Sequence, residues 1–158
     1  MKLLILAILV AVVGAGQIKI EDDSNVEVRV IKWEVLTDAK NFDDAEERCN
    51  REGAHLVSIH REDENEFVHS ITTTGQNITN FEHFVYIGLR KNSRGEWHWT
   101  DGSLVTYTKW AVHQPDEPET EHCAQLHQDP GPGLIYVEER RWNSIACNRP
   151  MKYFVCKP

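Results

Sequence analysis

The sequence predicts one α+β domain, because two helical patterns come first and a β-rich half follows them. The chain has 158 residues, the length of a single domain. Its 41% hydrophobic and 27% charged residues are an ordinary globular composition. Four cysteines and five tryptophans in so short a chain also indicate a small extracellular fold with a disulfide-bonded core.

The beginning of the chain is typical of a secretory signal peptide. Lys2 precedes an apolar run at residues 3–13, and small residues follow at 14–16. A membrane anchor is the alternative, but a spanning helix needs roughly 20 apolar residues, and Gln17 ends this run early. We therefore expect residues 1–16 to be a cleaved signal peptide, the product to be secreted, and no segment to span a membrane.

The mature chain is expected to have a short polar lead at residues 17–27, followed by the domain at residues 28–158. The formal charge of the whole sequence is −8. Nucleic acids and anionic membrane surfaces both select basic patches, so this acidic balance argues against either as the main partner.

The four cysteines, Cys49, Cys123, Cys147 and Cys156, are expected to form disulfides in an oxidising compartment. They allow three pairings, and their spacing does not choose among them. Zinc ligation is the alternative, but it favours closely spaced thiol pairs, which this sequence lacks.

The first elements are a strand at residues 28–36 and a helix that begins at Asn41. Asn41 is a favourable N-cap, and acids follow it in the first turn. Phe42 and Cys49 fall on one apolar face, and Gly53 stands where the helix would end.

A second helix is expected at residues 61–72, after a short strand at residues 55–59. Acidic residues are concentrated near its beginning, which complements the helix dipole. Phe67, Val68 and Ile71 are predicted to form its apolar face.

The second half of the sequence consists of strands and one long loop. The expected strands, apolar or alternating in pattern, are residues 85–89, 96–100, 123–126, 134–137 and 153–156. Between them, residues 106–122 are polar and acidic, and loops longer than about 12 residues are usually functional or disordered. Because Cys123 follows directly, we expect this loop to be anchored and ordered.

Oxygen-bearing side chains gather on and near this loop. Gln114 and Asp116 flank Pro115, Glu121 follows, and Asn143 comes from a separate segment. Calcium takes six to eight oxygen ligands, so these four residues are candidates for a calcium site. The alternative is that the acidic loop is only a solvated rim.

A series of short motifs carries a family resemblance. In chain order they are the helix with Cys49, then residues 85–89, 97–102, Trp110, 114–116, 121–123, 142–143, Cys147 and 154–156. Their order over residues 28–158 resembles the C-type lectin-like domain in its short form. The resemblance implies two helices, mixed and mostly antiparallel sheets, a long ligand-binding loop, and the disulfides Cys49–Cys156 and Cys123–Cys147.

The same resemblance implies a function. Gln114, Asp116, Glu121 and Asn143 match ligands of the family's principal calcium site, and the bond before Pro115 would be cis there. Two neighbouring sugar hydroxyls then bind the ion and hydrogen-bond its ligands. The Gln-Pro-Asp order goes with galactose-type sugars, whereas Glu-Pro-Asn goes with mannose-type sugars.

The sequence departs from this family pattern in ways that bear on the site. Ser144 stands where calcium-binding members have Asp, so it offers only its backbone carbonyl as a ligand. Glu117 and Pro118 follow Asp116, where galactose binders usually have an aromatic residue. Lys91 and Asn92 fall where auxiliary calcium sites need acids, so we expect one calcium ion at most.

Several other residues have simpler interpretations. The tryptophans Trp97, Trp99, Trp110 and Trp142 are expected to pack in the core rather than to form a sugar platform. We expect the histidines His113, His122 and His127 to lie at the surface rather than to bind a metal or sense pH.

Two further predictions concern chemistry. Asn77 begins the only N-x-S/T sequon, so it is the expected glycosylation site. No G-x-S-x-G, H-E-x-x-H or phosphate-binding glycine-rich motif occurs, so we do not expect an enzyme.

Two functions therefore remain open at the level of sequence. The first is a secreted, calcium-dependent lectin for glycans, with galactose-type sugars favoured. The second is a calcium-independent lectin-like module that binds a protein or another surface. Ser144 is the residue that separates them.

Overall fold

The computed structural model describes residues 33–39, 41–131 and 138–158. The expected signal peptide, the polar lead, most of the first expected strand and the strand expected at residues 134–137 lie outside the described residues. Among the residues that are described, no helix is both long enough and apolar enough to cross a membrane.

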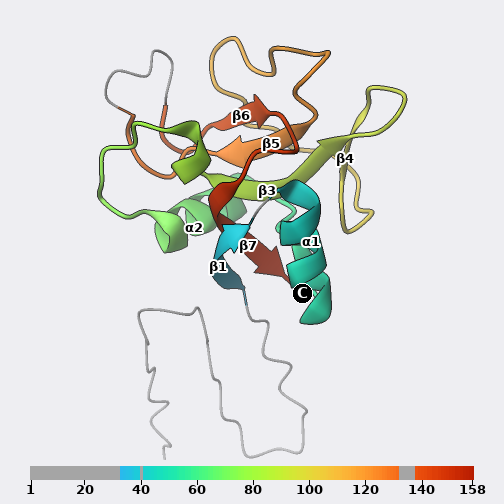
Figure 1. Ribbon diagram of the computed structural model, residues 1–158, viewed down its shortest axis with the longest axis horizontal. Helices are drawn as coiled ribbons and strands as arrows, with labels where there is room; N and C mark the ends of the chain where they lie inside the picture. Colours follow the sequence, from blue (N-terminus) through green and yellow to red (C-terminus); the bar gives the residue numbers. More distant parts are fainter. Residues whose placement is uncertain (1–32, 40, 132–137) are drawn as a thin grey trace, which may run out of the picture.

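A seven-stranded sheet organises the fold (Figure 1). The strands are β1 Glu34–Ala39, β2 His55–Leu56, β3 Val85–Lys91, β4 Trp97–Trp99, β5 Cys123–Leu126, β6 Trp142–Ile145 and β7 Met151–Lys157. The hydrogen-bonded order is β1-β7-β3-β5-β6, with β2 on β7 and β4 on β3. Among the strands of the described residues only β3 and β7 pair in parallel, so the sheet is mixed and mostly antiparallel, as expected.

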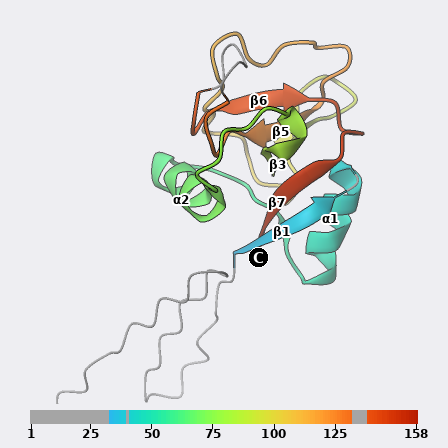
Figure 2. The ribbon, with the colours of Figure 1, turned by 60° about the vertical axis from the view of Figure 1, so that its left-hand side comes forward.

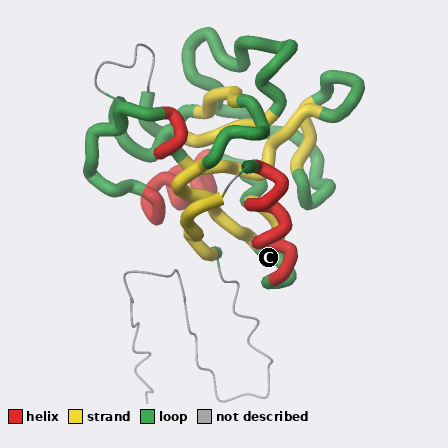
Figure 3. The backbone as a smooth tube through the Cα atoms, viewed as in Figure 1, coloured by secondary structure: helices red, strands yellow, loops and turns green. Residues whose placement is uncertain are grey.

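The helices are α1 Phe42–Arg51, α2 Glu62–Thr72 and the short 3₁₀ helix η1 Phe81–His83. α1 runs beside β1 and β7, whereas α2 lies on the other side of these strands (Figure 2). The part of the molecule beyond β5 and β6 is built mainly from loops (Figure 3). The α+β prediction is therefore confirmed, although neither η1 nor β6 was expected.

α1 forms as its sequence predicts. The Asn41 side chain accepts a hydrogen bond of 2.8 Å from the backbone N–H of Asp44, so it caps the helix. Phe42, Ala45 and Cys49 are fully buried on one face. Gly53 follows the helix with a φ of 70°, a left-handed conformation that glycine adopts without strain.

α2 differs from the prediction in the face that it buries. Val68 is buried, but Phe67 is 38% exposed, so the prediction for Phe67 is wrong. Polar Asn65 is fully buried instead, because its side chain donates to the Arg140 carbonyl oxygen and accepts from the Trp142 indole N–H. These long-range partners leave no signal in the helical periodicity.

Two disulfides join segments that are distant in the sequence. Cys49–Cys156 connects α1 to β7, and Cys123–Cys147 connects β5 to the turn after β6. The pairing implied by the family resemblance is therefore confirmed. In the loop-entropy description, these bridges contribute about 4–5 and 3–4 kcal/mol respectively.

The tryptophans pack as the sequence suggests. Trp99 and Trp142 are fully buried, with their rings edge to face at a centroid distance of 5.7 Å. Trp97 and Trp110 are partly buried against the same cluster and contact each other at 4.9 Å. This cluster fixes Trp142, and therefore the beginning of β6, against the core.

Gly88 lies in β3 where the chain from β2 passes over it. A Cβ atom at this position would stand 2.4 Å from the backbone oxygen of Leu56. Neither backbone can move freely, because the Gly88 N–H donates to the Val57 carbonyl oxygen at 2.8 Å.

We expect Gly88→Ala to lower the free energy of unfolding by about 1–3 kcal/mol or more, because overpacking forces a backbone shift. Ser93→Ala, in the exposed turn after the same strand, is the matched control and should change stability by less than about 0.5 kcal/mol. Urea denaturation of both variants measures the difference. Equal midpoints would contradict the packing of β2 against β3.

Candidate functional site

The candidate site forms where the long loop meets β6; the loop was expected at residues 106–122 and spans residues 100–122 in the structure. Trp110 makes an isolated bridge to Trp142, and the Ala111 N–H donates to the Trp142 carbonyl oxygen at 2.8 Å. The Trp142 N–H in turn donates to the Lys109 carbonyl oxygen at 2.8 Å. The loop is therefore fixed directly beside Asn143 and Ser144.

The turn at Pro115 presents two of the predicted ligands. The Gln114–Pro115 peptide bond is cis, as the family resemblance implies. The Gln114 side-chain amide donates to Asp116 Oδ1 at 2.8 Å, so the two side chains that flank the proline lie together.

Ser144 joins this turn to the rest of the site. Its side chain is fully buried, and its hydroxyl donates to Glu121 Oε2 at 2.6 Å. The Asp116 N–H donates to Ser144 Oγ at 3.1 Å, and the Ser144 N–H donates to Gln114 Oε1 at 2.9 Å. One buried serine thus contacts three of the four predicted ligands.

Glu121 and Asp116 bring two carboxylates to this cluster. Burial raises the pKa of Glu121, and the negative charge of Asp116 raises it further, although the hydrogen bond from Ser144 acts in the opposite direction. The cluster therefore contains negative charge that a cation or a proton would stabilise.

Asn143 lies next to the cluster without contacting the other ligands directly. Its side-chain amide donates to the Ser144 carbonyl oxygen at 2.5 Å. It lines the same cavity as Gln114, Asp116 and Glu121. The structure thus brings three predicted ligands into contact through Ser144 and places the fourth at the cavity wall.

The donor set fits a calcium ion in its chemistry. Carboxylate oxygens and the carbonyl oxygens of amides and of the backbone are the ligands that calcium prefers. Ser144 Oγ lies 2.9 Å from Gln114 Oε1 and 3.2 Å from Asp116 Oδ1. These are hydrogen-bond distances, and they place the serine hydroxyl among the side-chain oxygens that would hold an ion.

The charge of the set is low for such a site. Within the described part of the chain, no group of three or more His, Cys, Asp or Glu side chains is placed to hold a metal. Only Asp116 and Glu121 contribute carboxylates here. An ion bound by this set would belong to the weak extracellular class, with a Kd of about 10⁻⁴–10⁻³ M.

A cavity of about 510 Å³ opens at this cluster. Its lining includes residues that the sequence did not single out: Asn80, Phe81, Glu82, Val112, Ile145 and Arg149. They come from η1, the long loop, β6 and the turn after it. Only the tertiary arrangement places these segments around one cavity.

His127 also lines this cavity, and its position corrects a prediction. The side chain is only 1% exposed, so the expectation of a surface histidine is wrong here. It follows β5 directly, and the centroid of its ring lies 4.5 Å from that of the Phe84 ring. All of β5 is buried and the chain stays buried through Asp129, so no alternation in the sequence marks His127 as a core residue. His113 and His122 are exposed, as expected.

Two other predicted positions lie outside the cluster. Asn77 is exposed in the segment before η1, so a glycan could reach it, and glycosylation stays a prediction. The Lys91 ammonium donates to the Glu121 carbonyl oxygen at 3.3 Å, so this cation stands next to the loop. The expectation of one calcium ion at most stays a prediction.

Comparisons with known proteins agree with this architecture. Residues 38–158 match the family model of the lectin C-type domain. An α-N-acetylgalactosamine-specific lectin of Patiria pectinifera is 37% identical over 130 residues, which are 75% of this chain and 68% of that protein. One chain of a snaclec coagulation factor IX-binding protein of Protobothrops flavoviridis is 36% identical over 123 residues, which are 75% of this chain and 84% of that one.

Solved structures show the same fold. The mouse scavenger receptor C-type lectin carbohydrate-recognition domain superposes with a TM-score of 0.63 at 28% identity. The match covers 80% of this chain and 87% of that domain.

We expect Glu121→Gln to raise the melting temperature at about pH 7 in the presence of a chelator. Because folding raises the pKa of Glu121, the protonated carboxyl stabilises the fold at low pH, and this contribution is lost as the pH rises through the pKa of the folded state. The uncharged glutamine stands in for the protonated carboxyl at neutral pH. The stabilisation should therefore shrink as the pH falls to about 4. Glu119→Gln, an exposed carboxylate on the same loop, is the control and should show little effect. A stabilisation that grows on acidification would contradict the assignment.

Proposed function

Since the chain belongs to the lectin C-type domain family, we propose that it is a secreted carbohydrate-binding protein that holds galactose-type sugars with one calcium ion. The ion would be bound by Gln114, Asp116, Glu121 and Asn143, with Ser144 contributing oxygen from its backbone. The observation that carries this proposal is the convergence of three of these side chains on the Ser144 hydroxyl, in the wall of one cavity.

The chain's own groups are suited to a pair of sugar hydroxyls. Each hydroxyl both donates and accepts one or more hydrogen bonds. Asp116 and Glu121 supply acceptors, and the Gln114 and Asn143 amides supply donors. When bound, calcium would add direct coordination of two neighbouring hydroxyl oxygens. The hydrogen bonds through Ser144 orient the acceptors before any sugar arrives.

The preference for galactose-type sugars rests on the order Gln114-Pro115-Asp116 and on one relative. The lectin of Patiria pectinifera is described as specific for α-N-acetylgalactosamine, a sugar of the galactose type. Mannose-type sugars are the less favoured ligands under this proposal.

Secretion is part of the proposal. The sequence of residues 1–16 supports a signal peptide, followed by the polar lead at residues 17–27 and the domain from residue 28. The two disulfides suit an oxidising compartment.

A second function is favoured by one specific feature, the serine at position 144. Its hydroxyl and N–H close the loop through hydrogen bonds, and no cation is needed for these bonds. The relative from Protobothrops flavoviridis is described as binding coagulation factor IX, a protein. The alternative is therefore a calcium-independent module that binds a protein surface.

We expect the mature protein to be retained on immobilised galactose in millimolar calcium and to elute with a chelator. Asp116→Asn and Glu121→Gln should each weaken binding at least about tenfold, because a charge-assisted contact is worth about 1.5–3 kcal/mol. Glu119→Gln should bind normally. Retention that resists the chelator and survives both substitutions would favour the calcium-independent alternative.

Ser144→Asp is a gain-of-function test of the same site. A third carboxylate should tighten calcium binding at least about tenfold, because ligand charge sets affinity in such sites. Calorimetric titration with calcium measures the change, and Thr120→Asp, exposed on the long loop, controls for added charge alone. Equal calcium affinity in the parent and the Ser144→Asp variant would show that position 144 does not face the ion.

A further inference from the structure

A row of side chains on α2 faces the two segments that lead to the ligand cluster. Glu62, Asn65 and Glu66 stand three and four residues apart, so they lie on one face of the helix. One facing segment is part of the long loop, residues 107–109, and the other precedes and begins β6, residues 140–142. The first leads into the turn with the cis proline and the second into β6, so α2 contacts the chain just before both halves of the site.

Lys109 makes the link between α2 and the long loop. Its ammonium forms an ion pair with the Glu62 carboxylate and lies 3.7 Å from Glu66 Oε1. The Lys109 side chain is only 15% exposed, which is unusual for lysine and is tolerated because the charge is paired. The Tyr107 hydroxyl donates to Glu62 Oε2 at 2.6 Å. Two side chains of the loop therefore converge on one carboxylate of the helix.

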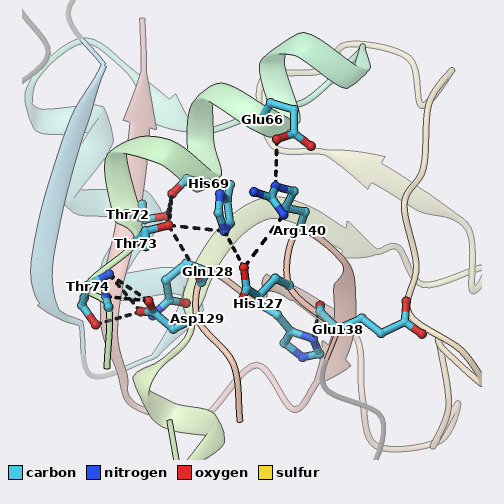
Figure 4. A network of polar contacts seen from close by, with 12 residues as sticks. Glu66, His69, Thr72, Thr73, Thr74, His127, Gln128, Asp129, Glu138 and Arg140 are labelled. Carbon is cyan, nitrogen blue, oxygen red and sulfur yellow. Dashed lines mark hydrogen bonds and ion pairs between the residues drawn. The ribbon is translucent and has the colours of Figure 1, made fainter. Parts of the chain in front are cut away.

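Glu66 and Asn65 hold the second segment. The Arg140 Nε–H donates to Glu66 Oε2 at 2.8 Å, as the dashed line between them in Figure 4 shows. The Asn65 side chain donates to the Arg140 carbonyl oxygen at 2.9 Å and accepts from the Trp142 indole N–H at 2.7 Å. The Trp142 backbone N–H donates to the Lys109 carbonyl oxygen at 2.8 Å. The long loop, α2 and the beginning of β6 thus form a closed ring of contacts.

These contacts restrain a segment that has little regular structure of its own. The long loop, residues 100–122, carries Gln114 and Asp116, and its hydrogen bonds to Ser144 form only if the loop lies against β6. A loop that had to be ordered at the moment of binding would cost affinity. Half-exposed ion pairs contribute little to global stability, so we expect this network to act locally, on the placement of the loop.

The network acts on the site from outside the cavity. Loop residues Gln114, Asp116 and Glu121 line the cavity, whereas neither Lys109 nor an acid of α2 is among the described residues that line it. The charge of Lys109 could still act over a distance, and that effect has a known sign. Removing a positive charge would by Coulomb attraction alone tighten the binding of a calcium ion. A role in holding the loop has the opposite sign, because its loss weakens binding.

We propose that Lys109 is a positioning residue for the ligand cluster. Its ion pairs with Glu62 and Glu66 hold the long loop against α2, so that the turn at Pro115 meets Ser144. The inference rests on the proposed function, because an effect of Lys109 on ligand affinity requires that the cluster bind a ligand. It also has a consequence in the protein without ligand: the hydrogen bonds between the turn and Ser144 open more often when the charge of Lys109 is removed.

The first test is amide hydrogen exchange, followed by NMR in the presence of a chelator. Lys109→Met keeps the length of the side chain and removes its charge. The N–H groups of Asp116 and Ser144, which bond across the site, should exchange at least about fivefold faster in this variant. The Gly88 N–H, which donates to the Val57 carbonyl oxygen in the core, should exchange as in the parent protein. This contrast separates a local opening from a general loss of stability.

Three further variants control the experiment. Lys109→Arg keeps the charge and the reach, so it should exchange as the parent does. Lys152→Met removes an exposed lysine on β7 and should change nothing at the site. Glu62→Gln should reproduce the effect of Lys109→Met in part. The double variant should then be no worse than Lys109→Met alone, because both substitutions break the same ion pair.

The second test measures methyl galactoside binding by calorimetry in saturating calcium. Lys109→Met should bind about fivefold more weakly than the parent, with a melting temperature within a few degrees of it. Lys109→Arg should bind as the parent does. Because methyl galactoside carries no charge, a weaker affinity reports the arrangement of the cluster rather than attraction between Lys109 and the sugar.

Several outcomes would overturn the positioning role. The Asp116 and Ser144 amides exchange as in the parent, or the Gly88 amide accelerates equally, or Lys109→Arg behaves like Lys109→Met. Tighter binding of calcium by Lys109→Met would likewise reduce the residue to a distant charge. If the parent protein binds no galactoside, the proposed function fails, whereas the exchange rates still decide whether Lys109 positions the loop.

Discussion

The attachment of the long loop to β6 through Ser144 is the constraint on which the site depends. One fully buried serine donates to Glu121, receives the Asp116 N–H and donates its own N–H to Gln114. Without a fixed point of this kind, two carboxylates on an irregular loop would repel each other and separate. The loop therefore has a defined conformation that hydrogen bonds alone can maintain.

The scaffold makes this attachment possible. Trp142 is buried in the tryptophan cluster and fixes the beginning of β6, one residue before Asn143. The Cys123–Cys147 disulfide ties the end of the loop to the turn that follows β6. Both ends of the site are thus joined to the core, and a domain rich in loops can still hold side chains at ligand distances.

The cavity extends this arrangement from a cluster of oxygens to a site of mixed chemistry. The ligand cluster provides charge and hydrogen bonds, whereas Phe81 and Val112 provide exposed apolar surface. Sugar sites are shallow and exposed to water, so each contact adds little affinity, and several units or several domains are needed for tight binding.

The sequence alone determined the features that depend on local patterns. The Asn41 cap and the apolar face of α1, the strands β3 and β5, and the polar loop with Gln114, Asp116 and Glu121 could all be predicted, because neighbours along the chain specify them. The order of the family motifs along the chain also allowed the fold and the pairing of the cysteines to be predicted. Only the tertiary structure decided that Asn65 replaces Phe67 on the buried face of α2, that Ser144 is the centre of the site, and that Phe81 and His127 share its cavity. These features arise from contacts between segments far apart in the chain, and such contacts leave no periodic signal in the sequence.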